Sequence, residues 1–153
     1  MKKNLLILIC GLLPGYSFSQ IDYFGQEPPG DSAIIFAPGI ISLDDRFDQS
    51  ITISPDGTEF LTGVSNMAWD YFSFTLSKKT DIGWQHGIEL PFLGANGDGL
   101  EPIYSYDNQS IFFTSSRPAY PSLNIWKASR DGDSWSNATK VETPVSSSSI
   151  EFE

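Results

Sequence analysis

Two stretches of this chain share one pattern: ITISPDGTEFLT at residues 51–62 and IYSYDNQSIFFT at residues 103–114. Each places a turn pair, Asp56-Gly57 in the first and Asp107-Asn108 in the second, between runs of apolar, β-branched and aromatic residues. Gly and Asn tolerate the positive φ that tight hairpins need, and the flanking runs favour strands. Each stretch is therefore predicted to form a β-hairpin.

Further markers recur around the two hairpins. Ser54 matches Ser105 and Trp84 matches Trp135, each at an offset of 51 residues. A Trp that recurs at one place in successive units is expected to pack between them, because buried aromatic side chains dominate core energetics. A sugar-stacking platform is the alternative role for these tryptophans. The order of the markers predicts an internal repeat.

Prolines suggest a slightly different period. Successive prolines lie 53 residues apart, at Pro38, Pro91 and Pro144. Each follows a short run with strand character and precedes a pair made of an apolar and an acidic residue. These pairs are Phe47-Asp48, Leu100-Glu101 and Phe152-Glu153. A third similarity, Asp70-Tyr71-Phe72 with Asn124-Ile125-Trp126, falls at a still longer offset. These offsets predict a three-residue length change in the intervening loops.

Each unit is predicted to contain four strands. Beyond the hairpin, a third strand fits residues 71–76 and 123–128, and a fourth fits the runs that end at the prolines. Apolar residues do not recur at helical spacing over three turns, so we expect no helix after the N-terminal segment. Four short strands in about 50 residues are typical of a propeller blade. The predicted fold class is all-β, with antiparallel four-stranded β-propeller blades.

A known family shows similar residues. The stretch Ser54-Pro55-Asp56-Gly57-Thr58-Glu59-Phe60, residues 101–118, and Asn124-Ile125-Trp126-Lys127 resemble the WD40-like propeller repeat of TolB-type bacterial proteins. The first unit departs from that repeat at residues 63–66, and Trp69 has no clear counterpart. The resemblance covers about residues 34–153 and implies a six-bladed or similar closed ring that is exported and acts as a binding or scaffolding module.

The length accommodates two blades of such a ring. Blade 1 is expected at about residues 47–91 and blade 2 at about 100–144, with the start of blade 3 at 150–153. Ile34–Ala37 matches the fourth strand of a blade that has no preceding strands, so we expect an orphan closing strand there. Residues 20–33 are expected to be an N-terminal linker. The chain is expected to be part of a longer protein, with its ring open or truncated.

The first residues are predicted to be a signal peptide. Lys2 and Lys3 precede the apolar run Leu5–Leu13, and small residues at 17 and 19 suit cleavage before Gln20. Such a run rises only about 14 Å as a helix, too little to span a bilayer. A lipoprotein signal at Cys10 is disfavoured because the preceding Ile9 is bulky. We expect residues 1–19 to be removed and the protein to be periplasmic or secreted, without a transmembrane segment.

Composition excludes several classes of function. With 9 basic and 19 acidic residues, the formal charge is −10, so nucleic acid is not an expected partner. One Cys and one His exclude a disulfide framework, a Cys-rich zinc site and a multi-histidine metal centre. His86 could act as a general base, but without a nucleophile identifiable nearby a surface position is favoured. No cofactor is expected.

The remaining candidates are weak metal ligands and surface contacts. Asp98, Asp131 and Asp133 lie in acidic, Gly-rich loops that resemble half of a calcium loop, although a solvated loop is the favoured explanation. Trp69, which the repeat does not require, is the better candidate for a surface contact. Arg117 could meet an anionic partner or pair with an acidic neighbour in the adjoining blade.

Two hypotheses of function follow. In the first, the chain is an exported, noncatalytic propeller module that binds a protein or a cell-envelope component. The alternative is a fragment of a carbohydrate-active or peptidase-associated propeller whose catalytic residues lie outside this chain. We favour the first because no motif in the chain places a catalytic constellation. Open blade faces would also permit self-association.

Overall fold

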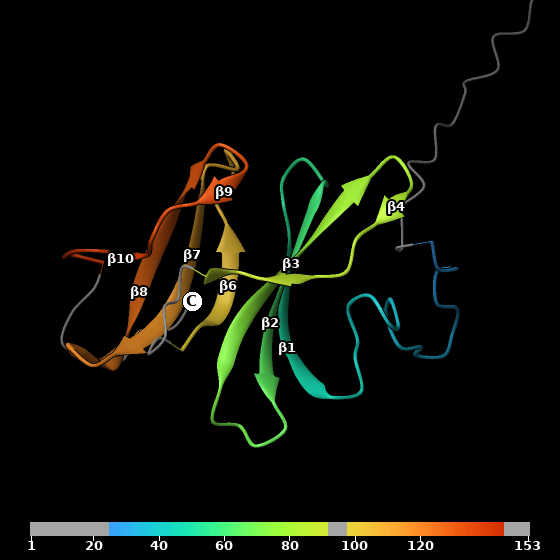
Figure 1. Cartoon of the computed structure of the whole chain (residues 1–153), viewed down its shortest axis with the longest axis horizontal. Coiled ribbons are helices and arrows are strands. Elements are labelled where there is room, and N and C mark those ends of the chain that lie inside the picture. The colour runs from blue at the N-terminus through green and yellow to red at the C-terminus, as the bar shows by residue number, and fades with distance from the viewer. Residues whose placement is uncertain (1–24, 92–97, 146–153) are drawn as a thin grey trace, which may run out of the picture.

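The computed structural model describes residues 25–91 and 98–145, and the elements within these ranges are all β-strands. They form two antiparallel sheets that lie side by side, each five-stranded (Figure 1). This confirms the predicted all-β class. The predicted signal peptide at 1–19 and the predicted start of a third blade at 150–153 lie outside the described residues.

The first sheet follows the chain strand by strand. Its order is β1 (Arg46–Ile53), β2 (Glu59–Asn66), β3 (Phe72–Thr80) and then β5 (Ile88–Glu89), while β4 (Gly83–Trp84) pairs with the end of β3. The second sheet repeats this arrangement with β6 (Leu100–Tyr104), β7 (Ser110–Arg117), β8 (Tyr120–Asp131) and β10 (Thr139–Lys140), and β9 (Ser134–Trp135) pairs with the end of β8. Both sheets thus have the four-strand order of a propeller blade.

The two sheets share one register, at the offset that separates Ser54 from Ser105. Phe60 pairs with Ser77, and the equivalent Ile111 pairs with Ala128. The last strands follow the same offset, because Leu90 N donates to Phe74 O and Val141 N donates to Ile125 O, each at 2.9 Å. The offset set by the serines and tryptophans is therefore the structural one.

The other two predicted offsets do not describe the register. Pro91 is equivalent to residue 142, not to Pro144, and both prolines lie beyond the paired residues of β5 and β10. Phe74 is equivalent to Ile125, so the alignment of residues 70–72 with 124–126 and the predicted loop-length change are wrong. The two hairpins span the same length of chain, residues 59–80 and 110–131, so no loop-length change separates them. They differ in pairing: relative to the start of its hairpin, β8 begins closer to the turn than β3 does.

The main hydrophobic core lies between the sheets. Phe74 and Phe113 are fully buried and meet edge to face, with ring centroids 5.2 Å apart. Around them lie buried residues from both sheets: Leu61, Leu76 and Leu90 from the first, and Tyr104, Ile111, Trp126 and Ala128 from the second. Burying an aromatic or aliphatic side chain of this size contributes about 1.5–3 kcal/mol. The packing of the two sheets on each other thus contributes substantially to stability.

The predicted orphan strand at Ile34–Ala37 does not form. Ala37 N donates to Gln26 Oε1 (2.9 Å) and Gln26 Nε2 donates to Ile35 O (2.8 Å), so one side-chain amide occupies the hydrogen-bonding groups a partner strand would need. Ala37 and Ile41 instead pack on Phe60, on the face of the first sheet that is turned away from the second. This segment therefore covers the first sheet from outside.

The second sheet also has an outer face, the one turned away from the first sheet. Its residues Phe112, Ile125, Lys127 and Val141 are equivalent to Leu61, Phe74, Leu76 and Leu90 of the core. Phe112 is flanked by Lys127, whose Nζ lies 5.9 Å from the ring centroid, and by Ile103, which is 49% exposed. This face thus repeats the core pattern with a charged residue in place of one leucine.

Candidate functional site

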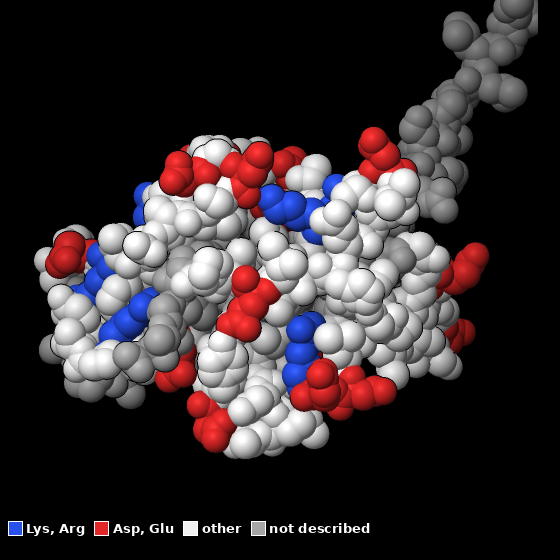
Figure 2. All heavy atoms as spheres, viewed as in Figure 1, with Lys and Arg blue, Asp and Glu red and all other residues white. Residues whose placement is uncertain are grey.

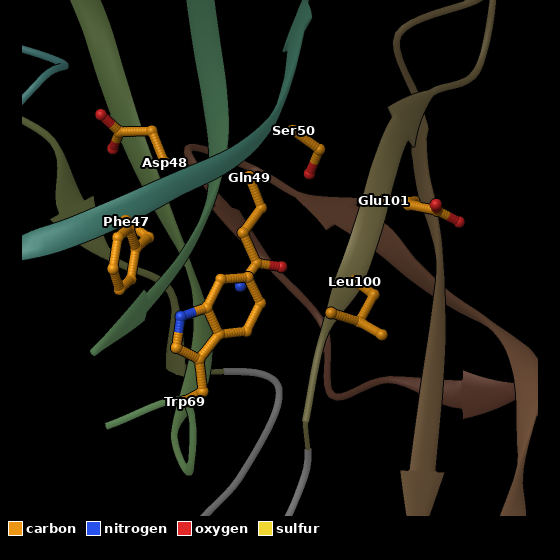
Figure 3. A pocket seen from close by; sticks show the side chains of 7 residues that line it. All are labelled: Phe47, Asp48, Gln49, Ser50, Trp69, Leu100 and Glu101. Carbon is orange, nitrogen blue, oxygen red and sulfur yellow. The ribbon is translucent and has the colours of Figure 1, made fainter. Parts of the chain in front are cut away.

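A cleft of about 330 Å³ opens where the first strands of the two sheets meet. We call it the Trp69 cleft; it is lined by Phe47, Asp48, Gln49, Ser50, Trp69, Leu100 and Glu101. Four of these residues come from β1, two come from β6, and Trp69 rises from the β2–β3 connection (Figure 3). The cleft is therefore built by both sheets together.

The backbone around the Trp69 cleft is irregular in both sheets. A β-bulge interrupts β1 between Asp48 and Ser50, and the register of β6 shifts between Leu100 and Ile103. Trp69 and Glu101 have φ angles of 57° and 50°, a region that residues other than Gly and Asn rarely adopt. Bulges re-aim side chains, and strained backbone clusters at functional sites. These features together mark the cleft as a candidate site.

Trp69 is presented by a well-fixed turn. Its backbone N donates to Asn66 O (3.2 Å), and the Asn66 side chain bonds across the turn to Asp70. The indole contacts Phe47 on one side and Phe72 on another, with centroid distances of 5.3 and 5.9 Å. It is nevertheless 55% exposed. A large aromatic surface is thus held open to solvent.

Two polar atoms lie buried beneath the Trp69 cleft. Gln49 Nε2 and Ser50 Oγ have no hydrogen-bond partner. Figure 3 shows the Gln49 side chain extending to the Trp69 ring. Ser50 lies over Gly63 of β2, where a Cβ would overlap the Ser50 hydroxyl. Gly63 therefore makes room for Ser50 between the sheets.

The charged groups of the Trp69 cleft are mostly acidic. Arg46 Nε donates to Asp48 Oδ1 (3.2 Å), and Arg46 Nη2 donates to Ile41 O (2.7 Å). Glu101 is exposed and has no ion-pair partner among the described residues. Figure 2 shows more acidic than basic side chains over one face of the molecule. The site is thus formed by an aromatic surface and a carboxylate without a counter-charge.

A second polar cluster joins the sheets at their other end. Glu59 accepts from Arg130 at both carboxylate oxygens (3.2 and 2.8 Å) and from Tyr104 OH (3.2 Å), and Lys78 Nζ lies 3.3 Å away. Burial alone would raise the pKa of Glu59, but the hydrogen bonds and charges of Arg130 and Lys78 lower it below its ordinary value. Burial, followed by the nearby Glu59 charge, raises the pKa of Tyr104. This cluster fastens one sheet to the other.

The predicted turn residues belong to the same end. Asp56 Oδ1 accepts from the Ser54 hydroxyl (2.6 Å) and Thr58 N (3.0 Å), and Asp107 Oδ1 accepts equivalently from Ser105 and Gln109. Gly57 and Asn108 have φ angles of 71° and 58°, as the hairpins require. Asn108 Nδ2 also donates to Asp56 Oδ2 (2.8 Å), linking the two turns.

Hydrogen bonding lowers the pKa of Asp56 to about 2. The Ser54 hydroxyl is the largest cause, and Thr58 and Asn108 add to it against the opposing effect of burial. The Ser54-Pro55-Asp56-Gly57 motif is therefore accounted for by the turn and the sheet contact it makes.

The repeated tryptophans lie at equivalent positions of their sheets, but only one of them packs between the units as expected. Trp135 packs against the core between the sheets, whereas Trp84 packs with Phe60 on the outer face of the first sheet. Trp84 meets Phe60 edge to face at 6.5 Å, and Trp135 lies 6.0 Å from Tyr104 with Arg130 over its ring. Arg117 lies over Trp126, with its Cζ 4.5 Å from the ring centroid, and burial lowers the pKa of Arg117. Trp84, Trp135 and Arg117 therefore lie outside the Trp69 cleft.

The acidic loops remain separate. Asp131 ends β8, Asp133 lies in the turn before β9, and Asp98 lies just before β6. Within residues 25–91 and 98–145, no three His, Cys, Asp or Glu side chains are grouped so that they could hold a metal ion. His86 lies exposed between β4 and β5. In the same ranges, no helix has the length and apolar character needed to cross a bilayer.

Sequence reasoning singled out Trp69 but missed the other cleft residues as a site. One signal was present, because the recurring apolar–acidic pairs Phe47-Asp48 and Leu100-Glu101 line the cleft from opposite sides. Gln49 and Ser50 have no such signal, since a bulge depends on how two strands pair. Comparison of the chain with protein-family models, with curated proteins and with solved structures yields no match.

Proposed function

We propose that this protein is an exported, noncatalytic binding module made of propeller blades, and that it binds a protein or cell-envelope partner through the Trp69 cleft. The observation that carries the proposal is the exposed Trp69 ring, held by a fixed turn in a cleft that both sheets build. Exposed aromatic side chains in concave sites are typical of binding surfaces.

Three further observations support this reading. The two sheets have the strand order of propeller blades, and their sequences resemble the TolB-type repeat, whose rings act as binding or scaffolding modules. The basic and apolar N-terminal residues favour export. Glu59 and Arg130, the most elaborate polar pair among the described residues, are occupied with each other and with joining the sheets, which is a structural task.

Cosedimentation with isolated cell envelopes tests the proposal. The full chain should sediment with envelopes, and Trp69→Ala should lower the bound fraction about tenfold, as expected for loss of an aromatic anchor. Tyr106→Ala is the matched control, because Tyr106 is 96% exposed and lies in the β6–β7 turn. Equal sedimentation of all three proteins would contradict the proposed role of the cleft.

Export has its own measurement. The protein recovered from its native host should be found outside the cytoplasm, with an N-terminus at or near Gln20. Recovery with Met1 intact, or with a lipid on Cys10, would contradict the signal-peptide interpretation.

A further inference from the structure

We infer that the Trp69 cleft recognises the cationic group of a lysine or arginine side chain, so that the partner presents a basic protein segment. The inference rests on the proposed function and names the chemistry of the partner. It follows from three properties of the cleft: the open aromatic surface, the kind of polar atoms that a ligand can reach, and the balance of charge.

The aromatic surface suits a cation. Cations bind over aromatic rings within about 6 Å of the centroid, and the indole of Trp is the best such ring. Trp69 is 55% exposed although Phe47 and Phe72 contact it, so part of the ring remains accessible. The fixed Asn66–Asp70 turn holds the ring in place before a ligand arrives, which reduces the entropic cost of binding.

The polar atoms of the cleft include both donors and acceptors. Two donors, Gln49 Nε2 and Ser50 Oγ, are buried without a partner, and the exposed Trp69 indole adds one N–H donor. Glu101 lines the cleft and is exposed, whereas the Asp48 carboxylate is paired with Arg46 and lies across β1 from Trp69 (Figure 3). A carboxylate accepts hydrogen bonds and donates none. A ligand group that meets Glu101 must therefore bring a donor, as an ammonium or a guanidinium does.

The charge balance points the same way. Arg46 is the basic residue next to the cleft, and it is already bonded to Asp48 and to Ile41 O. Glu101 has no counter-charge among the described residues, and the whole chain carries a formal charge of −10. Electrostatic complementarity of this kind favours a basic partner and speeds its association. An anionic ligand would be repelled by Glu101 and by the net negative charge of the chain.

An NMR titration of the full chain tests the inference. The probes are the acetylated and amidated tripeptides Gly-Lys-Gly and Gly-norleucine-Gly, which differ mainly in charge. The Trp69 indole N–H signal, identified by its loss in Trp69→Phe, should shift with the lysine peptide and not with the norleucine peptide. Raising the salt from about 0.05 to about 0.5 M should weaken binding, because surface charges are screened.

Variants then assign the contributions. Glu101→Gln should weaken binding of the lysine peptide about two- to fivefold, and Trp69→Ala about three- to thirtyfold. Asp81→Asn is the matched control for Glu101→Gln, because Asp81 is exposed in the β3–β4 turn at the other end of β3. It should leave the affinity unchanged. The dispersion of the amide signals reports whether each variant is folded.

The possible results are distinct. Equal binding of the two peptides, or equal weakening by Glu101→Gln and Asp81→Asn, would overturn the inference. Binding of a neutral oligosaccharide such as chitotriose with loss of signal in Trp69→Phe, and no binding of the lysine peptide, would replace it with glycan recognition. Either of these two results would leave the proposed function standing if envelope binding still depends on Trp69. If envelope binding does not depend on Trp69, the proposed function is contradicted, whatever the peptides do.

Discussion

Glu59 of the first sheet accepts hydrogen bonds from two side chains of the second sheet, those of Arg130 and Tyr104. Its side chain is 7% exposed, and Arg130, which pairs with both its oxygens, is 17% exposed. Removing one partner from such a pair leaves the other charge poorly solvated and unpaired. The pair therefore fixes how the two sheets meet.

Glu59→Gln should lower the free energy of unfolding by about 2 kcal/mol, less than for a fully buried pair because Arg130 retains some solvent. Urea denaturation measures the change. Asp131→Asn removes an exposed negative charge and serves as the control, with an expected change within about 0.5 kcal/mol. A double-mutant cycle of Glu59→Gln with Arg130→Gln should show coupling of at least about 1 kcal/mol; additive effects would contradict the pairing.

Stability should fall as the pH falls from about 5 towards 2. The carboxyls of Asp56 and Glu59 have lowered pKa values in the folded state, to about 2 for Asp56, against ordinary values of 3.8 and 4.5. In this window the unfolded chain binds more protons, so acid favours unfolding, and the contribution is complete above pH 5. Melting temperatures between pH 6 and 2 report it.

Asp56→Asn provides the comparison for this pH dependence. The variant lacks the titrating group, so its melting temperature should fall less steeply over the same range. If both proteins lose stability in parallel, Asp56 does not contribute as described.

Among the elements, the hairpins were the most predictable from sequence. Asp56-Gly57 and Asp107-Asn108 located them because a positive φ is a local demand that few residues meet. Register was harder, since it depends on pairing. The prolines follow β5 and β10, which are two residues each, so little pairing constrains where they fall. The segment at 34–37 has strand-like residues, but it is bonded by Gln26 instead of a strand.

Gly63 in β2 allows the close approach of Ser50 in β1. Gly63→Ala should lower stability by about 1–3 kcal/mol, because the new methyl group overlaps the Ser50 hydroxyl. Ser50→Ala/Gly63→Ala should recover most of the loss, since the remaining neighbours, Ser50 Cβ at 3.7 Å and Pro102 Cδ at 3.5 Å, allow ordinary contact. Thermal or urea unfolding of the three proteins decides; no recovery in the double variant would show that another contact is limiting.

In the whole molecule, the site was less predictable than the fold. Trp69 stood out because the repeat does not require it, and Arg117 was another candidate that instead lies on Trp126. The cleft is formed by two irregular strands, β1 and β6, that are far apart in the chain. A local sequence pattern does not predict that two such strands lie next to each other. The pairs Phe47-Asp48 and Leu100-Glu101 were markers of repetition whose shared location only the packing of the sheets shows.

Self-association should occur through the outer face of the second sheet. Ile103 and Phe112 lie on the face that, in the first sheet, packs against a neighbour. Apolar surface of this kind gains about 25 cal/mol per Å² when covered. The average mass at sedimentation equilibrium should therefore rise with concentration, and Ile103→Lys should reduce the rise. Ile82→Lys is the control, because Ile82 is 99% exposed in the β3–β4 turn; equal effects would point to unspecific association.

The polar contacts between the sheets lie apart from the cleft. Glu59–Arg130, Glu59–Tyr104 and Asp56–Asn108 all lie at the hairpin-turn end of the interface, whereas the Trp69 cleft lies where β1 and β6 meet at the other end. Within the described residues, the side-chain hydrogen bonds and ion pairs between the sheets are thus concentrated at the turn end, away from the Trp69 cleft. Substitutions at the turn end should therefore change the contact between the sheets without touching the cleft residues.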